Sequence, residues 1–319
     1  MLATAVAAAA KAATVIRDFA ARPEALDVRR KSPSDYVSAA DHAAEEAIAA
    51  IVHERHPDAV FIGEEGGAGG AIDAPGPVFV VDPLDGTTNF LHGFPWYAVS
   101  IGVLAHGEPV AGVVLNVASG ELFTATAGGG ARRNGEVIRV SPVTEPDRAL
   151  FATGAPFRKA DEIDAWFRTL RPVLEASSGI RRAGAAALDL ADVACGRFEA
   201  FWELTLNPWD VAAGILLVRE AGGVVTDLAG APKRVERGAI LAANPAFHPW
   251  MLERVRVAGA PERSWRAPPD RPTCGARRRR DRERPRRPPP RGRPLRRRRA
   301  APAGARLLAR NGPRAQGAA

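Results

Sequence analysis

Two carboxylates and a hydroxyl follow a short apolar run in the first third of the chain. Residues 78–81 are Val, Phe, Val and Val, and β-branched and aromatic residues of this kind favour a buried strand. The turn that follows carries Asp82, Asp85 and Thr87, whose hard oxygen atoms select Mg²⁺, Mn²⁺ or Ca²⁺ over softer metals. Gly86 in the same turn lets backbone N–H groups approach an anion closely. The segment therefore predicts a site for a cation and a phosphate-like anion.

Two further carboxylates lie far from this turn in sequence, Glu64 before it and Asp210 after it. Hydrolysis of a phosphate ester needs a nucleophile, neutralised phosphoryl charge and help for the leaving oxygen, and two metal ions about 3.5–4 Å apart can supply all three. Asp82 could bridge two ions, with Glu64 and the carbonyl of Leu84 completing one, and Asp85 with Asp210 holding the other. Because burial of three carboxylates without a cation would be very costly, we expect the three aspartates to be ligands rather than turn residues.

Hydrophobic periodicity and turn residues divide the chain into predicted helices and strands. Ser38 and Asp41 have capping-box spacing ahead of an apolar stripe, and Pro208 begins a predicted helix. Short turns between the strands of residues 97–126 imply antiparallel pairing, and Asn134 with Gly135 predicts a hairpin. The predicted helices are 3–22, 41–56, 161–175, 185–195, 209–221 and 249–255, and the predicted strands are 78–81, 97–104, 109–117, 121–126, 149–153, 198–203, 224–226 and 239–242.

Charge is distributed unevenly along the 319 residues. Residues 258–319 hold 20 Arg, 11 Pro and 4 acidic residues, a net charge of +16, so the net charge of +8 for the whole chain leaves −8 on residues 1–257. The tail has no hydrophobic periodicity and should be disordered. Three interpretations of it stay open: a segment that binds nucleic acid, a solvated extension, or translation of a shifted frame in a GC-rich gene.

The cysteine count and the lengths of the apolar stretches also indicate the cellular compartment of the protein. Two Cys in a chain of this size exclude a disulfide scaffold and fit a reducing environment. No apolar stretch reaches the roughly 18 residues that a membrane span needs, and the Ala-rich start lacks the basic and strongly apolar regions of a signal peptide. We therefore expect a cytoplasmic protein with no membrane partner.

Four segments with chemistry-bearing residues occur in one order along the chain, at residues 31–41, 61–66, 78–90 and 208–214. Together they resemble the inositol monophosphatase family over roughly residues 5–257. The resemblance implies an αβαβα layered sandwich, the α+β fold of inositol monophosphatase and fructose-1,6-bisphosphatase-like sugar phosphatases. An N-terminal half of residues 1–140 would carry the metal-binding motifs, a C-terminal half of residues 141–257 the Trp-Asp motif, and residues 258–319 the disordered tail.

The resemblance implies two to three Mg²⁺ ions. Glu64, Asp82 and the carbonyl of Leu84 would hold the first, and Asp82, Asp85 and Asp210 the second. A third, weaker ion would lie near Glu64. These assignments agree with the ligand sets inferred from the residue types alone.

The resemblance also implies catalytic and substrate-binding roles. A water would be the nucleophile, ordered by Glu64 and Thr87, and Asp41 would accept from the Thr87 hydroxyl and orient it. Glu203 would bind substrate hydroxyls, and the N–H groups of Gly86 and Thr87 would hold the phosphate. The predicted substrate-binding residues are Asp85, Gly86, Thr87, Ala186, Glu203 and Asp210.

One residue departs from the family pattern. Relatives usually carry Ser or Thr where this chain has Ala185, and the missing hydroxyl removes one possible substrate contact without affecting any metal-ligating side chain. Lys31 and Asp35 would lie on the loop that closes over the site. A homodimer and sensitivity to lithium are further expectations from the resemblance.

Other functions compete with the favoured one, which is hydrolysis of inositol monophosphate to inositol and phosphate. Haloacid-dehalogenase-type phosphatases place one residue between their two aspartates, whereas Pro83 and Leu84 separate Asp82 from Asp85, so we set that class aside. Histidinol phosphate, a bisphosphonucleotide and fructose bisphosphate stay open as substrates of the small phosphorylated type. A non-enzymatic alternative is a transcription- or RNA-associated binding factor, with nucleic acid contacted only through the basic tail.

Overall fold

Two β-sheets organise the part of the chain that the computed structural model describes, residues 1–22, 28–32, 35–66, 70–156 and 160–256. The tail predicted to be disordered, residues 258–319, lies outside the described residues. The helices are α1 (Leu2–Ala20), α2 (Ala39–Arg55), α3 (Thr87–Leu91), α4 (Ala160–Leu174), α5 (Ala186–Ala194), α6 (Pro208–Glu220) and α7 (Phe247–Val255). The strands are β1 (Arg29–Ser32), β2 (Asp35–Val37), β3 (Val60–Gly63), β4 (Val78–Asp85), β5 (Ala98–Ala105), β6 (Glu108–Asn116), β7 (Leu122–Thr126), β8 (Gly130–Arg133), β9 (Glu136–Val137), β10 (Leu150–Thr153), β11 (Gly179–Arg181), β12 (Ala200–Leu206), β13 (Val224–Thr226) and β14 (Gly238–Ala243).

The larger sheet has seven strands in the order β3-β4-β5-β6-β7-β8-β9. Only β3 and β4 pair parallel, and the strands from β4 onward pair antiparallel. Short turns join the strands from β5 to β7, as the sequence predicts. The smaller sheet has the order β11-β10-β12-β14-β13, with β10 parallel to both of its neighbours. A separate antiparallel pair is formed by β1 and β2.

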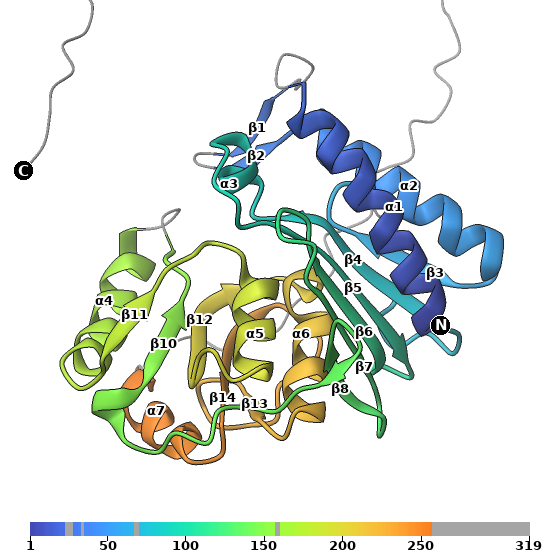
Figure 1. Ribbon diagram of the computed structural model, residues 1–319. Helices are drawn as coiled ribbons and strands as arrows, with labels where there is room; N and C mark the ends of the chain where they lie inside the picture. Colours follow the sequence, from blue (N-terminus) through green and yellow to red (C-terminus); the bar gives the residue numbers. More distant parts are fainter. Residues whose placement is uncertain (23–27, 33–34, 67–69, 157–159, 257–319) are drawn as a thin grey trace, which may run out of the picture. The chain divides into compact units, whose positions relative to one another are not determined.

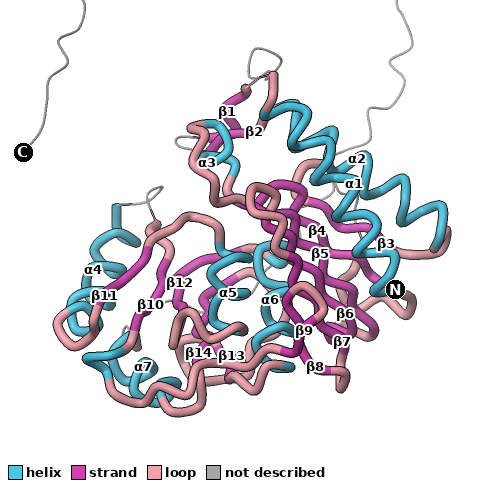
Figure 2. The backbone as a smooth tube through the Cα atoms, in the orientation of Figure 1, coloured by secondary structure: helices cyan, strands magenta, loops and turns pink. Residues whose placement is uncertain are grey.

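Helices and sheets alternate in five layers (Figures 1 and 2). Helices α1 and α2 cover one face of the seven-stranded sheet, and α5 and α6 lie between its other face and the five-stranded sheet. The far face of the five-stranded sheet is covered by α7, which packs against α4. The order α/β/α/β/α confirms the predicted layered sandwich.

Three apolar cores fill the spaces between successive layers. The first contains Ile48 of α2 and Phe79 of β4. The middle core contains Val80 of β4 and Leu216 of α6. The third contains Phe247 of α7 beside the five-stranded sheet. Each sheet is therefore buried on both faces, which explains why its central strands are almost continuously apolar rather than alternating.

Strand β4 contributes to two cores because its side chains alternate between faces. Phe79 belongs to the first core and Val80 to the middle core. The same period of two places Asp82 on the α6 side of the sheet, opposite Ser100 of β5. The sequence of this strand thus aims Asp82 at the layer that carries Asp210.

Helix α6 approaches the seven-stranded sheet closely because small residues face each other there. A Cβ added to Gly102 of β5 would lie 2.4 Å from the Cβ of Ala212, and one added to Gly112 of β6 would lie 3.0 Å from the carbonyl oxygen of Ala213. A close-packed interior has no free volume for such an atom, so adding it would displace the helix. The close contact brings the first turn of α6, with Asp210, toward the end of β4.

The sequence prediction gives no range for β1, β2, β3, β8, β9, β11, α3 or the 3₁₀ helix Pro146–Arg148, although its hairpin signal implies β8 and β9. Each has at most five residues, which is too short for hydrophobic periodicity to register. The remaining helices and strands differ from prediction by a few residues at their ends. The hairpin predicted at Asn134 and Gly135 is confirmed, since it joins β8 to β9 and both residues have positive φ, 52° and 88°.

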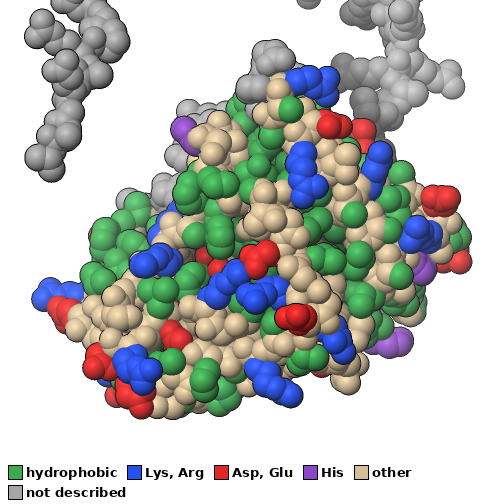
Figure 3. Space-filling model, viewed as in Figure 1, with side chains coloured by type: hydrophobic (Ala, Val, Ile, Leu, Met, Phe, Trp, Pro, Cys, Tyr) green, Lys and Arg blue, Asp and Glu red, His purple; other side chains and the backbone are tan. Residues whose placement is uncertain are grey.

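Charged side chains of both signs are intermixed on the face of the molecule seen in Figure 3. Among the described residues, Arg197 takes part in a mixed cluster of this kind, because its guanidinium contacts Glu121 and lies 2.8 Å from Asp192, while Arg133 lies 3.9 Å from Glu121. The face in view therefore presents no extended basic area. None of the described helices combines the length and apolar character needed to cross a lipid bilayer.

Replacing Gly102 with Ala should destabilise the fold by about 1–3 kcal/mol, because the added methyl group overpacks the contact with Ala212. Urea denaturation would measure the loss in free energy of unfolding. Gly76→Ala is the matched control, since a Cβ there meets only the carbonyl of Asp58 at an ordinary 3.7 Å. Equal stability of the two variants would contradict the tight packing of α6 on β5.

Candidate metal and phosphate site

Asp82 is the most buried of the four carboxylates predicted as ligands, with 2% of its surface exposed. Its Oδ1 accepts a hydrogen bond from the backbone N–H of Leu84 at 3.0 Å. Burial, together with the negative charges of Glu64, Asp85 and Asp210, holds the pKa of Asp82 well above its usual range. These three carboxylates are therefore close enough to Asp82 for their charges to disfavour its ionised form.

Asp85 links the end of β4 to helix α5. Its Oδ2 accepts from the backbone N–H of Ala187 at 2.8 Å, and Ala185, the residue that precedes the helix, provides no side-chain cap. Asp85 therefore satisfies an N–H group at the helix start that would otherwise lack a partner. Burial raises the pKa of Asp85 to about 7, with repulsion from Glu64 adding to it, although hydrogen bonds from the backbone of Ala187 and Ala186 act in the opposite direction.

Asp210 lies in the first turn of α6, which begins with Pro208 after the N-cap residue Asn207. Its Oδ2 accepts from the backbone N–H of Asn207 at 2.6 Å and so completes a capping box. Burial raises the pKa of Asp210 well above the ordinary value, and the charges of Glu64 and Glu203 raise it further. The N-terminal N–H groups of this helix favour negative charge nearby.

Glu64 directly follows β3, whose parallel pairing with β4 places it beside the aspartate turn. Its backbone N–H donates to the carbonyl of Val81 at 3.2 Å, one residue before Asp82. The charge of Glu64 raises the pKa of Asp82, Asp85 and Asp210 alike. The structure thus brings together four predicted carboxylates from three separate stretches of sequence.

The hydroxyl of Thr87 lies between two acceptors. Its Oγ1 is 3.0 Å from Oδ1 of Asp41 and 3.1 Å from the carbonyl oxygen of Leu84. Asp41 is 1% exposed, and its Oδ2 accepts from both the N–H and the hydroxyl of Ser38, at 2.8 and 2.7 Å. The capping box predicted for α2 is confirmed, and its carboxylate serves the helix and the threonine at once.

Gly86 and Asn89 connect the aspartate turn to the opposite half of the chain. Gly86 has a φ of +86°, and a Cβ there would lie 3.0 Å from the carbonyl oxygen of Trp96. Asn89 donates from Nδ2 to the carbonyls of Trp96 and Ala183, at 2.7 and 2.9 Å. Our sequence reasoning missed Asn89, although it lies within the motif of residues 78–90, because nothing local distinguishes its amide from a solvated one.

The predicted substrate-binding residues of the second half lie beside these carboxylates. Ala186 is the first residue of α5 and is 8% exposed. Glu203 is half-buried in β12, and its charge raises the pKa of Asp210. Lys31 and Asp35 belong to β1 and β2, and their side chains lie outside the described residues.

Several buried polar atoms have no hydrogen-bond partner within the described residues, namely Trp96 Nε1, Ser100 Oγ, Ser177 Oγ, Asp189 Oδ1 and Trp209 Nε1. Ser100 pairs with Asp82 across the sheet, and Trp209 precedes Asp210. Asp189, which sequence reasoning also missed, has its pKa raised by burial and by Asp85 and Glu203. Unpaired buried polar atoms are costly, so those of Ser100 and Asp189 favour a polar ligand beside Asp82 and Asp85.

The donor set fits a hard divalent cation, although the side chains are not arranged around one. Within the described residues, no three His, Cys, Asp or Glu side chains form a ready metal cluster. Asp82 and Asp210 each direct one oxygen at a backbone N–H, while their second oxygens accept no hydrogen bond from the described residues. Among the described side chains, no cationic one is a main influence on the pKa of Asp82, Asp85 or Asp210. Acidic oxygen donors without a cationic partner are what Mg²⁺ and similar ions bind.

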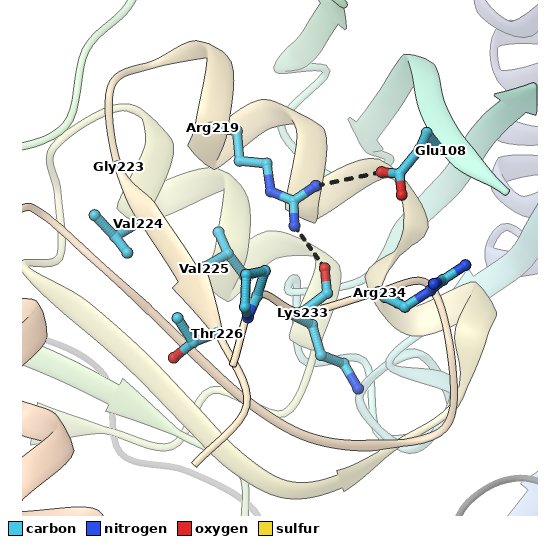
Figure 4. Close-up of a pocket in the computed structure, with 9 residues that line it drawn as sticks. Glu108, Arg219, Gly223, Val224, Val225, Thr226, Lys233 and Arg234 are labelled. Atoms are coloured by element: carbon cyan, nitrogen blue, oxygen red, sulfur yellow. Dashed lines mark hydrogen bonds and ion pairs between the residues drawn. The ribbon is translucent and has the colours of Figure 1, made fainter. Parts of the chain in front are cut away.

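A hollow of about 470 Å³ elsewhere in the described chain contains none of the predicted site residues. Figure 4 shows Arg219, at the end of α6, reaching between Glu108 and the carbonyl of Lys233. The guanidinium lies 3.9 Å from the Glu108 carboxylate and 2.5 Å from that carbonyl oxygen. The side chains of Lys233 and Arg234 point away from it. Arg219 thus links β6, through Glu108, to the loop between β13 and β14, and the cationic groups do not converge on one point.

Comparison with known proteins identifies the family. A family model described as "Inositol monophosphatase family" matches residues 1–260. The chain belongs to the inositol monophosphatase family. The resemblance predicted from four sequence motifs is therefore confirmed, and membership places the chain among metal-dependent phosphatases.

Individual relatives carry two kinds of name. The chain is 45% identical over 235 residues to an inositol-1-monophosphatase of Rhizobium meliloti, covering 72% of this chain and 86% of the relative. It is 44% identical over 247 residues to the Nus factor SuhB of Pseudomonas aeruginosa, covering 76% and 91%. Among solved structures, the extragenic suppressor protein SuhB of Bartonella henselae superposes with a TM-score of 0.75 at 42% identity, covering 80% of this chain and 98% of the other.

If the inositol monophosphatase carboxylates hold Mg²⁺, the ion should stabilise the folded protein. At a concentration 100 times its Kd, Mg²⁺ should raise the melting temperature by about 5–10 °C. Asp82→Asn should abolish this rise and leave the metal-free protein as stable as wild type or slightly more so, because it relieves like-charge repulsion. Calorimetric melting of both proteins, with the exposed Asp147→Asn as control, measures the effect. A full Mg²⁺-dependent rise in Asp82→Asn would remove Asp82 from the ligand set.

Proposed function

We propose that this chain is a Mg²⁺-dependent phosphomonoesterase that hydrolyses inositol monophosphate to inositol and phosphate. The observation that carries the proposal is the common electrostatic environment of Glu64, Asp82, Asp85 and Asp210. These carboxylates surround a turn whose backbone is suited to an anion. Relatives named inositol-1-monophosphatase, at 43–45% identity, support this choice of substrate.

Two to three Mg²⁺ ions would be held by these residues. Glu64, Asp82 and the carbonyl of Leu84 would bind one ion, and Asp82, Asp85 and Asp210 a second, with a weaker third near Glu64. When bound, the ions neutralise phosphoryl charge and make a coordinated water more acidic. Inhibition by lithium is part of the proposal.

Thr87 is suited to orient the nucleophilic water. A hydroxyl has one proton and two lone pairs, so Thr87 can donate to Asp41 and still accept a hydrogen bond from a water. Ser38 holds the Asp41 carboxylate in place through two hydrogen bonds. Glu64 provides a second acceptor for the same water, which directs the oxygen lone pair of the water toward phosphorus.

The phosphate and the polyol would be bound by different groups. The N–H groups of Gly86 and Thr87, and the positive end of α6 beside Asp210, favour the phosphoryl oxygens. Glu203, together with Asp85 and the backbone of Ala186, would accept from or contact the hydroxyls of the polyol. Because Ala185 brings no hydroxyl, recognition of the polyol depends more heavily on Glu203.

The test is phosphate release by the full chain from four esters, with and without Mg²⁺. The panel is myo-inositol 1-phosphate, histidinol phosphate, adenosine 3′,5′-bisphosphate and fructose 1,6-bisphosphate. We expect Mg²⁺-dependent turnover that favours the inositol ester and is abolished in Asp82→Asn. Preference for another ester would keep the site and change the substrate, whereas turnover without Mg²⁺ would reject the mechanism.

Glu203→Gln should weaken recognition of the polyol rather than the chemistry. Losing a hydrogen bond to a charged group costs about 1.5–3 kcal/mol, so kcat/KM for inositol 1-phosphate should fall about tenfold or more. Hydrolysis of p-nitrophenyl phosphate, which has no polyol hydroxyls, should change little at saturating Mg²⁺. Glu175→Gln on the surface is the control. Equal losses on both substrates would assign Glu203 to the metal site instead.

A second candidate function rests on the relatives named Nus factor SuhB, at 41–44% identity. In that role the chain would bind the transcription machinery or RNA. A pull-down of RNA polymerase or RNA with the full chain, repeated without Mg²⁺ and at raised salt, tests it. Two results together would favour the binding role: capture that needs no Mg²⁺ and weakens at raised salt, and no turnover of the four esters. Contacts to RNA phosphates are salt-sensitive and need no Mg²⁺.

A further inference from the structure

We propose that Glu45 is a positioning residue that fixes the backbone around Glu64 and thereby sets the affinity of the site for divalent cations. The inference rests on the proposed function in that it takes Glu64 to be a metal ligand. Glu45 lies in α2, one helical turn after Asp41, so both residues occupy the same face of that helix. It does not contact the reacting groups in this scheme, and it acts through the loop that follows β3.

The carboxylate of Glu45 is bound by two consecutive backbone N–H groups. Oε2 accepts from the N–H of Glu65 at 2.8 Å, and Oε1 accepts from the N–H of Gly66 at 2.7 Å. Glu45 is 7% exposed, so these bonds are made largely out of water. Successive N–H groups turned toward one anion form a concave binding site. Here that anion is a side chain of the protein itself.

The residue before Glu64 leaves room for this arrangement. A Cβ added to Gly63 would lie 2.2 Å from Oε2 of Glu45 and 2.5 Å from its Cδ. Any side chain at position 63 would therefore displace the carboxylate from its two donors. The sequence Gly-Glu-Glu-Gly at 63–66 thus combines space for Glu45, the candidate ligand and the two N–H donors in four residues.

These bonds hold Glu64 from one side while the sheet holds it from the other. The N–H of Glu64 donates to Val81, next to Asp82, and the two residues after Glu64 are bound to Glu45. Repulsion among the site carboxylates would otherwise push Glu64 away from Asp82. Because the backbone is fixed on both sides, Glu64 is less able to move away from Asp82. Its carboxylate is therefore preorganised for binding a cation.

Groups that orient a metal ligand typically change metal affinity by 10–100-fold when they are removed. Glu45→Gln keeps the shape of the side chain but replaces one acceptor oxygen with an NH₂ group, which cannot accept from an N–H. Glu46→Gln is the matched control, because Glu46 is exposed on the same helix one residue further along. Gly63→Ala should have the effect of Glu45→Gln without removing any charge.

The experiment measures Mg²⁺ binding by calorimetry and amide hydrogen exchange of Glu65 and Gly66 in the full chain, without substrate. We expect Glu45→Gln to weaken Mg²⁺ binding tenfold or more and to speed exchange at both amides, with Glu46→Gln unchanged. Gly63→Ala should weaken Mg²⁺ binding similarly, and the double variant should be no weaker than either single one, because both act on the same contact.

Glu45→Gln that binds Mg²⁺ like Glu46→Gln would overturn the proposal, even if its melting temperature falls, since a purely structural role would produce that pattern. If Glu45→Gln does not fold, wild-type Mg²⁺ affinity in Gly63→Ala would overturn it in the same way. Failure of the proposed function would look different. Wild-type protein would then release no phosphate from any ester, while the effects on Mg²⁺ binding and exchange would still decide the role of Glu45.

Discussion

Carboxylates that share a buried site repel one another, and the surrounding structure has to hold them against that repulsion. Burial and mutual charge raise the pKa of Asp82, Asp85 and Asp210 together. Each aspartate is restrained by a backbone N–H close to it in space, from Leu84, Ala187 and Asn207 in turn. These bonds orient the carboxylates without neutralising them. The negative charge that remains is the basis of the proposed preference for Mg²⁺.

The five layers explain how residues so far apart in sequence reach one place. Alternation along β4 turns Asp82 toward α6, and the small residues between β5 and α6 let that helix come close enough to bring Asp210 to the strand end. On the other face of the same sheet, α2 reaches the two neighbouring loops from a single face of the helix. Asp41 contacts Thr87, and Glu45 binds the loop around Glu64.

The sequence allowed prediction of features that are encoded locally. The capping box of Ser38 and Asp41, the buried strand before Asp82 and the hairpin at Gly135 all rest on residues a few positions apart. The short elements β1, β2, β3, β11 and α3 were missed because they are too brief to show a period. The roles assigned to the ligands came from residue types and from motif order, and they stay predictions until Mg²⁺ binding and turnover are measured.

Contacts between distant segments were not predictable, because no local pattern records them. Asp85 meets Ala187 across 102 residues, and Asn89 meets Ala183 across 94. Ala185 was interpreted from sequence only as a lost substrate contact. In the structure its position is the uncapped start of α5, where Asp85 from the other half supplies the missing acceptor.

The hydrogen bonds of the Asp41 carboxylate couple the motion of the first turn of α2 to the orientation of Thr87. Because this carboxylate caps the first turn of α2 through Ser38 and also accepts from Thr87, the opening of that turn and the loss of threonine orientation are one event. The two segments therefore form a single cooperative unit, whose local unfolding free energy sets how much of the time Thr87 is out of place. A partner or a covalent change that loosens the start of α2 would reach Thr87 through this shared carboxylate, without contacting the proposed substrate.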